Sequence, residues 1–440
     1  MPVVILHGWS DTSASFQSLG QWLKSNGFDV TNIWLGDYLS MNDEITLFDL
    51  GAAFQRALAD NNIPQTPHSF DLIVHSTGGL VAREYLWQIC DGDPSVTPVS
   101  HLLMMSPANF GSPLASLGKS VLGRLFKGWG WNHVGQTGTQ ILNALELASP
   151  YSWQLAESDL FNPAFKICTP AHTIVTVLAG TVAYDDPLRR TVHEDGSDGT
   201  VRVSTANLNA HYLKLNFSDP AKPTLVSMPR CFDPIAFAVF PRNHTTIHDP
   251  LQPDPNNDWA NVVKCALTTD PGGYADLVAK CQTITKGTIA AGQAANEHPD
   301  WFHEYQHVVF RVKDQFGEPI TDYVVEFYQE IGDQADAVFD EVHSDILEKV
   351  TTNSTDASYR SFLFDTTDLV KYIKQNANAD IQMSLSAANV SDRIIYRNPK
   401  SGVDVFTNGN QQFLYPNEPV MVDVLLCRDS TRDVFKLTLE

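Results

Sequence analysis

The chain has 440 residues, of which 43% are hydrophobic and 18% are charged, a balance that excludes intrinsic disorder and predicts more than one compact domain. Its formal net charge of −22 argues against nucleic acid as a partner, because binding to phosphates needs concentrated Lys and Arg. The same surplus of acid would repel an anionic membrane overall, so any contact with lipid is expected to be local.

Six cysteines are scattered along the chain, at Cys90, Cys168, Cys231, Cys265, Cys281 and Cys427. None forms a C-x-x-C pair, so the sequence indicates neither a zinc site nor a redox motif, and it leaves disulfide pairing open. No apolar run approaches the roughly 18 to 20 residues of a membrane span, and the N-terminus lacks the features of a cleaved signal peptide. We therefore expect a chain without a cleaved signal, or a mature form, that is cytoplasmic or peripherally bound to a membrane.

An apolar run at residues 3–6 predicts a first core strand, and His7-Gly8-Trp9-Ser10 follows it. Helical and strand-like periodicities then alternate, with helices at 15–24, 44–60 and 80–89 and strands at 29–35, 72–74 and 99–105. Strands separated by helices of this length predict parallel pairing with right-handed crossovers. The expected fold class is therefore α/β, with a doubly wound parallel sheet.

The stretch from residue 69 to 83, SFDLIVHSTGGLVAR, combines a buried strand, a tight turn and a helix. This order is typical of a nucleophile elbow, which lifts a serine hydroxyl, here that of Ser76, above the sheet. Small residues must surround the nucleophile because the turn strains the backbone, and Gly78 and Gly79 supply that room. Val74 replaces the first glycine of the usual G-x-S-x-G pattern. The alternative is an ordinary strand–turn–helix with a surface serine.

In hydrolases with such an elbow, a His-Gly pair after the first core strand leads into a loop whose backbone N–H faces the nucleophile. The sequence thus predicts an oxyanion hole made by the N–H groups of Trp9 and Thr77. Such donors stabilise a transition state by roughly 2.7 to 4 kcal/mol each. The alternative for His7-Gly8 is a plain turn after a strand.

Residues 114–131 differ from their surroundings, because apolar residues recur at helical spacing and the only charges are Lys119, Arg124 and Lys127. No Asp or Glu occurs from residue 94 to 145, which is an exception in so acidic a chain. The composition predicts an amphipathic cap, within an insertion around residues 110–165, that lies over the site and contacts a lipid interface. A core-facing helix with solvated lysines fits the pattern equally well.

A β-branched run at 173–179 is followed by an acidic, glycine-rich loop, EDGSDGTVRVS, at residues 194–204. Serine hydrolases of this fold place the triad acid in such a loop, and Asp198 stands in the form D-G-x-V-x-x-S. Asp198 is the expected acid, and Asp195, followed by Gly196, is the alternative. The loop could also be an acidic surface turn without a catalytic role.

Further strand-like runs occupy 212–217 and 234–240, and Pro241-Arg242-Asn243-His244 comes directly after the second. The order serine, acid, histidine is the one that this fold requires. His244, nearest the strand end, is the expected base. His248 remains the alternative, because it lies four residues later and would share a face with His244 in a helix.

Ser76 in HSTGG, His7-Gly8-Trp9-Ser10, Asp198 and His244 together resemble the lipases and esterases of the α/β-hydrolase superfamily. The HGWS start, the elbow and a C-terminal extension are most similar to the PlaB-type bacterial phospholipases A and lysophospholipases A, over the motifs and layout of residues 3–250. That family's elbow reads Thr-His-Ser-Thr-Gly, whereas this chain has Val74 in the first place. The resemblance implies a bacterial protein that associates with membranes without a cleaved signal and that self-associates.

From about residue 303 the pattern changes to short β-rich runs separated by turn residues, at 308–312, 323–328, 359–364, 381–385, 394–396, 420–426 and 434–439. Strands at such spacing predict a β-sandwich. We therefore expect an α/β-hydrolase catalytic domain at 1–285, a linker at 286–302 and an all-β, sandwich-like domain at 303–440. Nothing in this last domain resembles a second active site.

The sequence thus predicts a serine hydrolase that cleaves carboxylic esters of lipids, as a phospholipase A, lysophospholipase A or lipase. Ser76 would attack the ester, His244 would move the proton, and Asp198 would orient the imidazole. The reaction would need no metal and no organic cofactor. The alternatives are a carboxylesterase for small soluble esters and a catalytically silent hydrolase fold that binds lipid or protein.

Overall fold

The computed structural model describes residues 1–9, 11–28, 33–117, 138–295, 297–329, 337–376, 380–406 and 413–439. The chain divides into two compact units. The first comprises Met1–Asn209 and Arg230–His303, and the second comprises Ala210–Pro229 and Glu304–Glu440. Each unit has a hydrophobic core of its own.

The first unit is built on a six-stranded parallel sheet with the order β2-β1-β3-β4-β5-β8. Its strands are β1 (Val3–Leu6), β2 (Ile33–Gly36), β3 (Phe70–His75), β4 (Val99–Met105), β5 (Ile174–Gly180) and β8 (Ala236–Phe240). Every residue of β3 and β5 is buried, as expected for parallel strands covered on both faces. This sheet confirms the predicted α/β-hydrolase class of fold.

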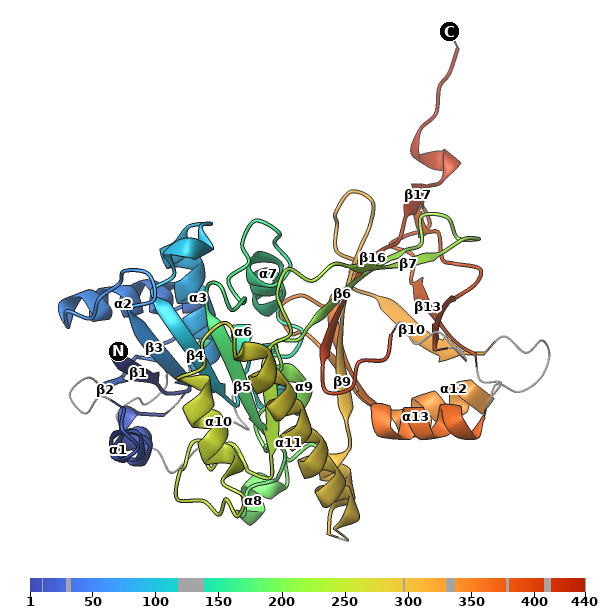
Figure 1. Cartoon of the computed structure of the whole chain (residues 1–440). Coiled ribbons are helices and arrows are strands. Elements are labelled where there is room, and N and C mark those ends of the chain that lie inside the picture. The colour runs from blue at the N-terminus through green and yellow to red at the C-terminus, as the bar shows by residue number, and fades with distance from the viewer. Residues whose placement is uncertain are drawn as a thin grey trace. The chain divides into compact units, whose positions relative to one another are not determined.

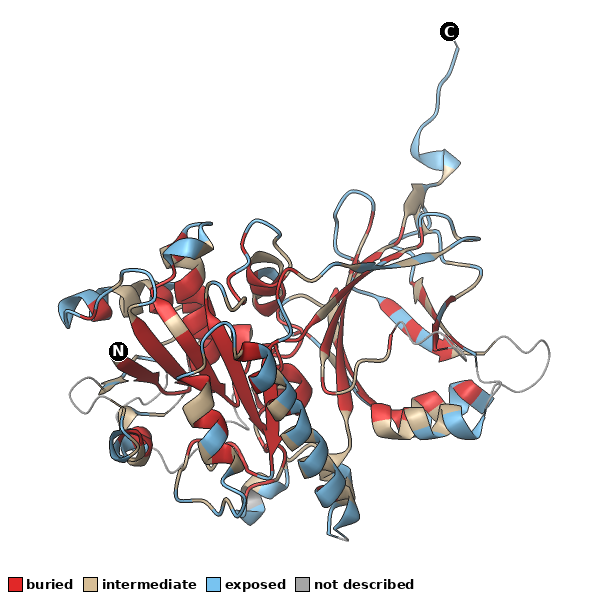
Figure 2. Cartoon of the chain, in the orientation of Figure 1, coloured by how far each residue is buried: buried red, intermediate tan, exposed pale blue. Residues whose placement is uncertain are grey.

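Helices cover the sheet of the first unit (Figure 1). They include α1 (Gln17–Ser25), α2 (Leu47–Asp60), α3 (Gly78–Cys90), α7 (Pro150–Asp159), α10 (Asp258–Ala266) and α11 (Tyr274–Ala294). Shorter ones are α4 (Pro113–Ser116), α6 (Thr139–Leu145), α8 (Pro187–Arg190) and α9 (Val203–Ala206). Residues of α1, α10 and α11 share one core with alternate residues of the sheet, including Ile5, Ile73 and Leu103. The sheet is therefore the most deeply buried layer of this unit (Figure 2).

The segment expected as a linker, 286–302, is instead largely helical. Helix α11 continues to Ala294, and a short 3-10 helix spans Pro299–Phe302. The last turn of α11 packs against Phe302, since a Cβ at Gly292 would overlap that ring. Tertiary packing thus accompanies a helix that extends through most of this segment.

The second unit contains a six-stranded sheet with the order β11-β12-β9-β16-β6-β7 and a three-stranded sheet with the order β10-β13-β15. The strands of the larger sheet are β6 (His211–Asn216), β7 (Thr224–Met228), β9 (Tyr305–Lys313), β11 (Leu347–Thr352), β12 (Tyr359–Asp365) and β16 (Pro419–Leu425). Those of the smaller sheet are β10 (Tyr323–Tyr328), β13 (Ile381–Ala387) and β15 (Val403–Phe406). Alternate residues of both sheets, such as Phe310 and Phe327, meet in one core, which is the arrangement of a sandwich.

This unit also contains helical and minor β elements. They are α12 (Ala337–Glu341), the π-helical turn Val342–Ile346, α13 (Thr366–Gln375) and the pair formed by β14 (Ile394–Tyr396) and β17 (Arg428–Ser430). The expected strand at 434–439 does not form. A 3-10 helix spans Arg432–Val434, and the side chains of Phe435 and Leu437 are 77% and 86% exposed. Among the described residues, no strand pairs with this stretch.

The hairpin β6–β7 belongs to the second unit, although the sequence predicts one domain for all of residues 1–285. It leaves the first unit after Asn209, and β6 pairs in parallel with β16, more than 200 residues later in the chain. Leu213 and Leu215 are buried in the core of the second unit. The chain between Asp198 and His244 therefore passes through both units.

Most of the predicted cap, residues 118–131, lies outside the described residues. The structure describes only its first four residues, Leu114 to Leu117, at the end of helix α4. All six cysteines are free thiols. Within the described part of the chain, no helix combines the length and the apolar character required to span a bilayer.

Candidate active site

Ser76 lies in the turn between β3 and α3 and has φ = +55°, in the left-handed region that residues other than glycine rarely adopt. Two backbone hydrogen bonds hold the turn: Ser76 N–H donates to Met105 O at 3.2 Å, and Gly79 N–H donates to Ser76 O at 3.0 Å. A strained serine between a buried strand and a helix is the geometry of a nucleophile elbow. The backbone strain is concentrated at the one residue whose hydroxyl the turn presents.

Glycines provide the space that this turn needs. A Cβ at Gly8 would lie 2.6 Å from Ser76 Cβ, and one at Gly78 would lie 3.0 Å from His7 O and 3.3 Å from Val74 Cβ. Val74 is fully buried and pairs with Leu6 of β1, and Gly78 leaves room for its branched side chain. Gly78 thus compensates for the missing first glycine of the elbow.

A cavity of about 160 Å³ opens beside Ser76. One part of its wall is apolar and includes Ala108, Leu114, Leu142 and Leu145. The polar part of the wall includes Asp11, His75, Ser76, Arg189, His244 and His248. A cavity with an apolar wall and a few convergent polar groups is suited to a substrate that carries both an acyl chain and a polar ester.

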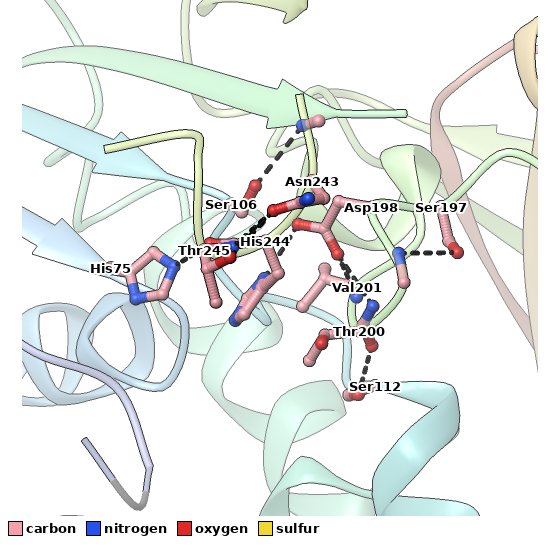
Figure 3. A network of polar contacts seen from close by, with 12 residues as sticks. His75, Ser106, Ser112, Ser197, Asp198, Thr200, Val201, Asn243, His244 and Thr245 are labelled. Carbon is pink, nitrogen blue, oxygen red and sulfur yellow. Dashed lines mark hydrogen bonds and ion pairs between the residues drawn. The ribbon is translucent and has the colours of Figure 1, made fainter. Parts of the chain in front are cut away.

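Asp198 and His244 are in direct contact (Figure 3). His244 Nδ1–H donates to Asp198 Oδ2 at 2.8 Å, and the backbone N–H of His244 donates to Asp198 O at 3.0 Å. The other carboxylate oxygen, Oδ1, accepts from the N–H groups of Thr200 at 2.9 Å and Val201 at 2.7 Å. Because Asp198 is 1% exposed and His244 7%, the imidazole is held in one orientation inside the protein.

The alternative acid and base lie in different surroundings. Asp195 is exposed, and its carboxylate is 4.0 Å from Nε2 of His193. His248 lines the cavity, but its Nδ1 has no hydrogen-bond partner within the described chain. Burial lowers the pKa of His248 to about 4. The geometry therefore brings Asp198 into hydrogen-bond contact with His244, whereas no carboxylate forms a hydrogen bond with Nδ1 of His248 in the described chain.

The Ser76 hydroxyl lies near the loop of His7-Gly8, since a Cβ at Gly8 would be 3.1 Å from Ser76 Oγ. Ser76 and His244 line the same cavity, and the described structure contains no hydrogen bond between their side chains. Such contacts are often long in the absence of substrate and shorten when substrate binds.

The predicted oxyanion donors flank the nucleophile. Trp9 N–H donates to Thr77 Oγ1 at 3.3 Å, which brings the two predicted residues together. Thr77 is the N-cap residue of helix α3, and its N–H has no acceptor within the part of the chain that the structure describes. An N–H at the start of a helix is well suited to bind a negative oxygen.

Sequence reasoning missed the role of His75 in this site. His75 Nε2–H donates to the backbone carbonyl of His244 at 2.9 Å, so the residue before the nucleophile holds the loop of the expected base. Burial lowers the pKa of His75 well below its usual value, and the nearby rings of His244 and His248 lower it further. The only signal in the sequence was the adjacency of His75 to Ser76.

Arg189 was also missed. It follows β5 in α8 and lines the cavity, with its guanidinium 5.1 Å from the centre of the Tyr184 ring. It is the one Lys or Arg among the described residues that line the cavity. No local pattern distinguishes Arg189 from Arg190, and only the fold places one of them at the site.

A family model described as palmitoyl protein thioesterase matches residues 2–138, a range that includes the elbow. No curated protein sequence matches the chain. Among solved structures, the phospholipase PlaB from Legionella pneumophila is 28% identical, with a TM-score of 0.82 over 100% of this chain and 96% of that chain. PlaB in complex with thio-NAD is 27% identical, with the same TM-score and coverage. These comparisons confirm the resemblance inferred from the motifs.

Proposed function

We propose that this chain, which is an ester hydrolase of the α/β-hydrolase superfamily, cleaves the carboxylic esters of phospholipids through an acyl-enzyme on Ser76. The observation that carries the proposal is the His244–Asp198 hydrogen bond in the wall of the cavity that also contains Ser76. Similarity to PlaB over the whole chain supports phospholipid as the substrate class.

In the proposed reaction, Ser76 Oγ attacks the ester carbonyl carbon while His244 Nε2 accepts its proton. Asp198 keeps the proton of Nδ1 in place and stabilises the imidazolium that forms. The carbonyl oxygen becomes negative and accepts hydrogen bonds from the N–H groups of Trp9 and Thr77, so Trp9 N–H exchanges Thr77 Oγ1 for the oxyanion. His244 then protonates the leaving alcohol.

The second half of the reaction releases the acid. A water molecule takes the place of the alcohol, His244 removes its proton, and the hydroxide attacks the acyl carbon bound to Ser76. The tetrahedral intermediate collapses, Ser76 Oγ recovers the proton from His244, and a fatty acid leaves. Every step uses side chains and N–H groups of the first unit.

The lining of the cavity supports a phospholipid substrate. The apolar wall at Leu114, Leu142 and Leu145 suits an acyl chain. Arg189 supplies a positive charge in the same cavity, and Arg forms strong hydrogen bonds with phosphate oxygens. The proposal therefore assigns the acyl chain to the apolar wall and the phosphate to Arg189. Peripheral contact with a membrane surface and self-association belong to the same proposal.

The test is a hydrolysis profile of the full-length protein on diacyl phospholipid, lysophospholipid, triglyceride, a soluble nitrophenyl ester and an S-palmitoyl thioester. Labelling by a fluorophosphonate, with the labelled peptide identified by mass spectrometry, shows whether Ser76 is the nucleophile. The proposal predicts labelling at Ser76 and release of fatty acid from phospholipid. If the protein prefers the thioester, or hydrolyses soluble esters but no phospholipid, the assignment of phospholipid as the substrate class is wrong.

A further inference from the structure

Three side chains with metal-binding chemistry meet on one side of the cavity. Asp11, His75 and His248 each offer one ligand atom, and these three atoms lie within 4.8 Å of one another. They come from distant parts of the chain: the loop after β1, the end of β3 and the loop after β8. All three line the cavity that contains Ser76, yet none takes part in the bond-making or proton-transfer steps of the proposed ester hydrolysis.

His75 is prepared to act as a ligand. A backbone carbonyl can only accept a hydrogen bond, so Nε2 of His75 carries the proton that it donates to His244 O. A neutral ring then has its lone pair on Nδ1, and His75 Nδ1 is buried without a partner in the described structure. Histidines that bind metals almost always donate their other N–H to a carbonyl, a carboxylate or water, as His75 does.

His248, in the loop after β8, is also buried with an unused ring nitrogen. Its side chain is 7% exposed, and its Nδ1 is likewise buried without a partner in the described structure. The His248 and His75 rings lie with their centres 4.9 Å apart, edge to face. A pair of buried imidazoles with unused nitrogens is costly unless something binds those nitrogens, because a buried polar atom without a partner loses its hydration.

Asp11 contributes the charge. Its Oδ1 accepts hydrogen bonds from Thr12 N–H at 2.7 Å and Ser15 Oγ–H at 2.5 Å, which fix the carboxylate. Its Oδ2 accepts none within the described chain. Two imidazole nitrogens and one carboxylate oxygen form the ligand set of many zinc sites, in which water takes the fourth position. Magnesium and calcium prefer oxygen ligands, so this set favours zinc.

We propose that Asp11, His75 and His248 bind a Zn²⁺ ion that occupies the cavity beside Ser76 and inhibits ester hydrolysis. Zinc ligands bind at about 2.0 to 2.2 Å, so the three ligand atoms must each approach the ion by roughly 1 Å. The ion then fills cavity space that an ester needs. One of its ligands, His75, directly precedes Ser76 in the chain. The proposal goes beyond the proposed ester hydrolysis, none of whose steps involves a metal.

The test measures metal binding and inhibition separately on the full-length protein, first freed of metal with a chelator. Calorimetric titration with ZnCl₂ should show one ion per chain, and Co²⁺ in its place should give the intense visible bands of a four-coordinate site. Zn²⁺ should inhibit hydrolysis of a nitrophenyl ester with the same midpoint as binding, and a chelator should restore the rate.

Asp11→Asn and His248→Gln each remove one ligand, and each should weaken Zn²⁺ binding by at least roughly 10- to 100-fold, the loss typical of disturbing a metal site. Asp37→Asn is the matched control. This carboxylate bonds to Ser13 and lies 3.5 Å from His7, close to the same loop but outside the cluster, so zinc affinity should not change. Circular dichroism checks that each variant is folded.

The proposal is overturned if Zn²⁺ binds both variants as it binds the unaltered protein, because the ion would then be held elsewhere, for instance by His244. Tight binding without inhibition would overturn the placement of the ion beside Ser76. Because the titration uses no substrate, absence of zinc binding is distinguishable from failure of the proposed phospholipase activity.

Discussion

Nδ1 of His244 donates a 2.8 Å hydrogen bond to Oδ2 of Asp198, and this bond joins the loops that follow two adjacent parallel strands, β5 and β8. The strand ends can approach because Gly180 has no side chain. A Cβ there would lie 2.9 Å from Asp198 Cβ. The acid and the histidine therefore meet at the carboxyl edge of the sheet, where α/β folds place their sites.

The first prediction compares the two acids and the two histidines. Asp198→Asn should lower kcat by roughly 10⁴, because the amide no longer holds the required tautomer of His244. His244→Ala should be at least as damaging, since no other group accepts the serine proton. Asp195→Asn and His248→Gln serve as the matched controls, and both should keep far more activity on a nitrophenyl ester. A larger loss for His248→Gln than for His244→Ala would exchange the assignment of the base.

A second prediction concerns Ser76→Ala. Removal of the nucleophile should reduce turnover on the order of 10⁶-fold and abolish fluorophosphonate labelling. The melting temperature should not fall, because the hydroxyl forms no hydrogen bond within the described chain and alanine is slightly smaller. Retention of more than a few per cent of the activity would contradict the assignment of Ser76.

The elbow could be predicted because its information is local. Ser76, Gly78 and Gly79 lie within four positions, and strain at the serine demands small neighbours. The choice between Asp198 and Asp195 could not be made from the sequence, since both stand beside a glycine in one loop. Burial and the N–H groups of Thr200 and Val201 distinguish them, and these depend on the folded loop.

The pairing of strands that are distant in the chain could not be predicted from the sequence. The run at 212–217 was predicted as a strand, but its partner, β16, lies two hundred residues away. Conversely, residues 434–439 alternate like a strand and form none, and no strand of the described chain pairs with them. The grouping of Asp11, His75 and His248 has no local pattern at all, and three loops must fold before it exists.

A third prediction tests the assignment of Arg189 to the phosphate. A charged hydrogen bond contributes about 1.5 to 3 kcal/mol, so Arg189→Gln should lower kcat/KM for phospholipid by roughly 10- to 100-fold. A neutral nitrophenyl ester has no phosphate, and its hydrolysis should change much less. The measured quantity is the ratio of the two kcat/KM values.

Arg190→Gln is the control for this comparison. Its guanidinium lies 5.2 Å from the centre of the Trp301 ring and donates to Nε2 of His298 at 3.1 Å, and it does not line the cavity. The same charge is lost from the adjacent position, so the ratio should stay unchanged. If both variants shift the ratio equally, the effect is that of net surface charge, and Arg189 has no particular role.

The fourth prediction is a pH dependence of stability that arises from His193. Burial lowers its pKa to about 4, and this outweighs Asp198 and Glu194, which raise it. The unfolded chain binds a proton at the ordinary pKa of about 6.5, so His193 destabilises the fold as pH falls from 6.5 towards 4. The loss from this group is at most about 3 kcal/mol.

Urea unfolding measured between pH 7 and pH 4 checks this. His193→Gln cannot be protonated, so its free energy of unfolding should fall less steeply with acid than that of the unaltered protein. His68→Gln, at an exposed position, should follow the unaltered protein. Parallel curves for His193→Gln and the unaltered protein would show that His193 is not buried as a neutral ring.

The last prediction concerns the dependence of the first unit on the second. A chain truncated after His303 keeps the hairpin β6–β7 but loses β16, the strand with which β6 pairs. Leu213, Leu215 and Phe217 are each at most 1% exposed in the complete protein and would then face solvent. An unpaired strand edge with exposed apolar residues favours aggregation, so this truncated chain should be largely insoluble.

A matched variant removes the hairpin as well. Asn209 and Arg230, which flank the hairpin segment 210–229, are in contact, since Arg230 Nη2–H donates to Asn209 O at 2.8 Å. A Gly-Ser linker of about eight residues spans roughly 15 Å on average, which is ample to replace residues 210–229. This variant of the first unit should be soluble, unfold cooperatively and hydrolyse a nitrophenyl ester, because Ser76, Asp198 and His244 all remain. Equal solubility of both truncated chains would show that β6 does not need β16, whereas a folded but inactive linker variant would show that the second unit contributes to the active site.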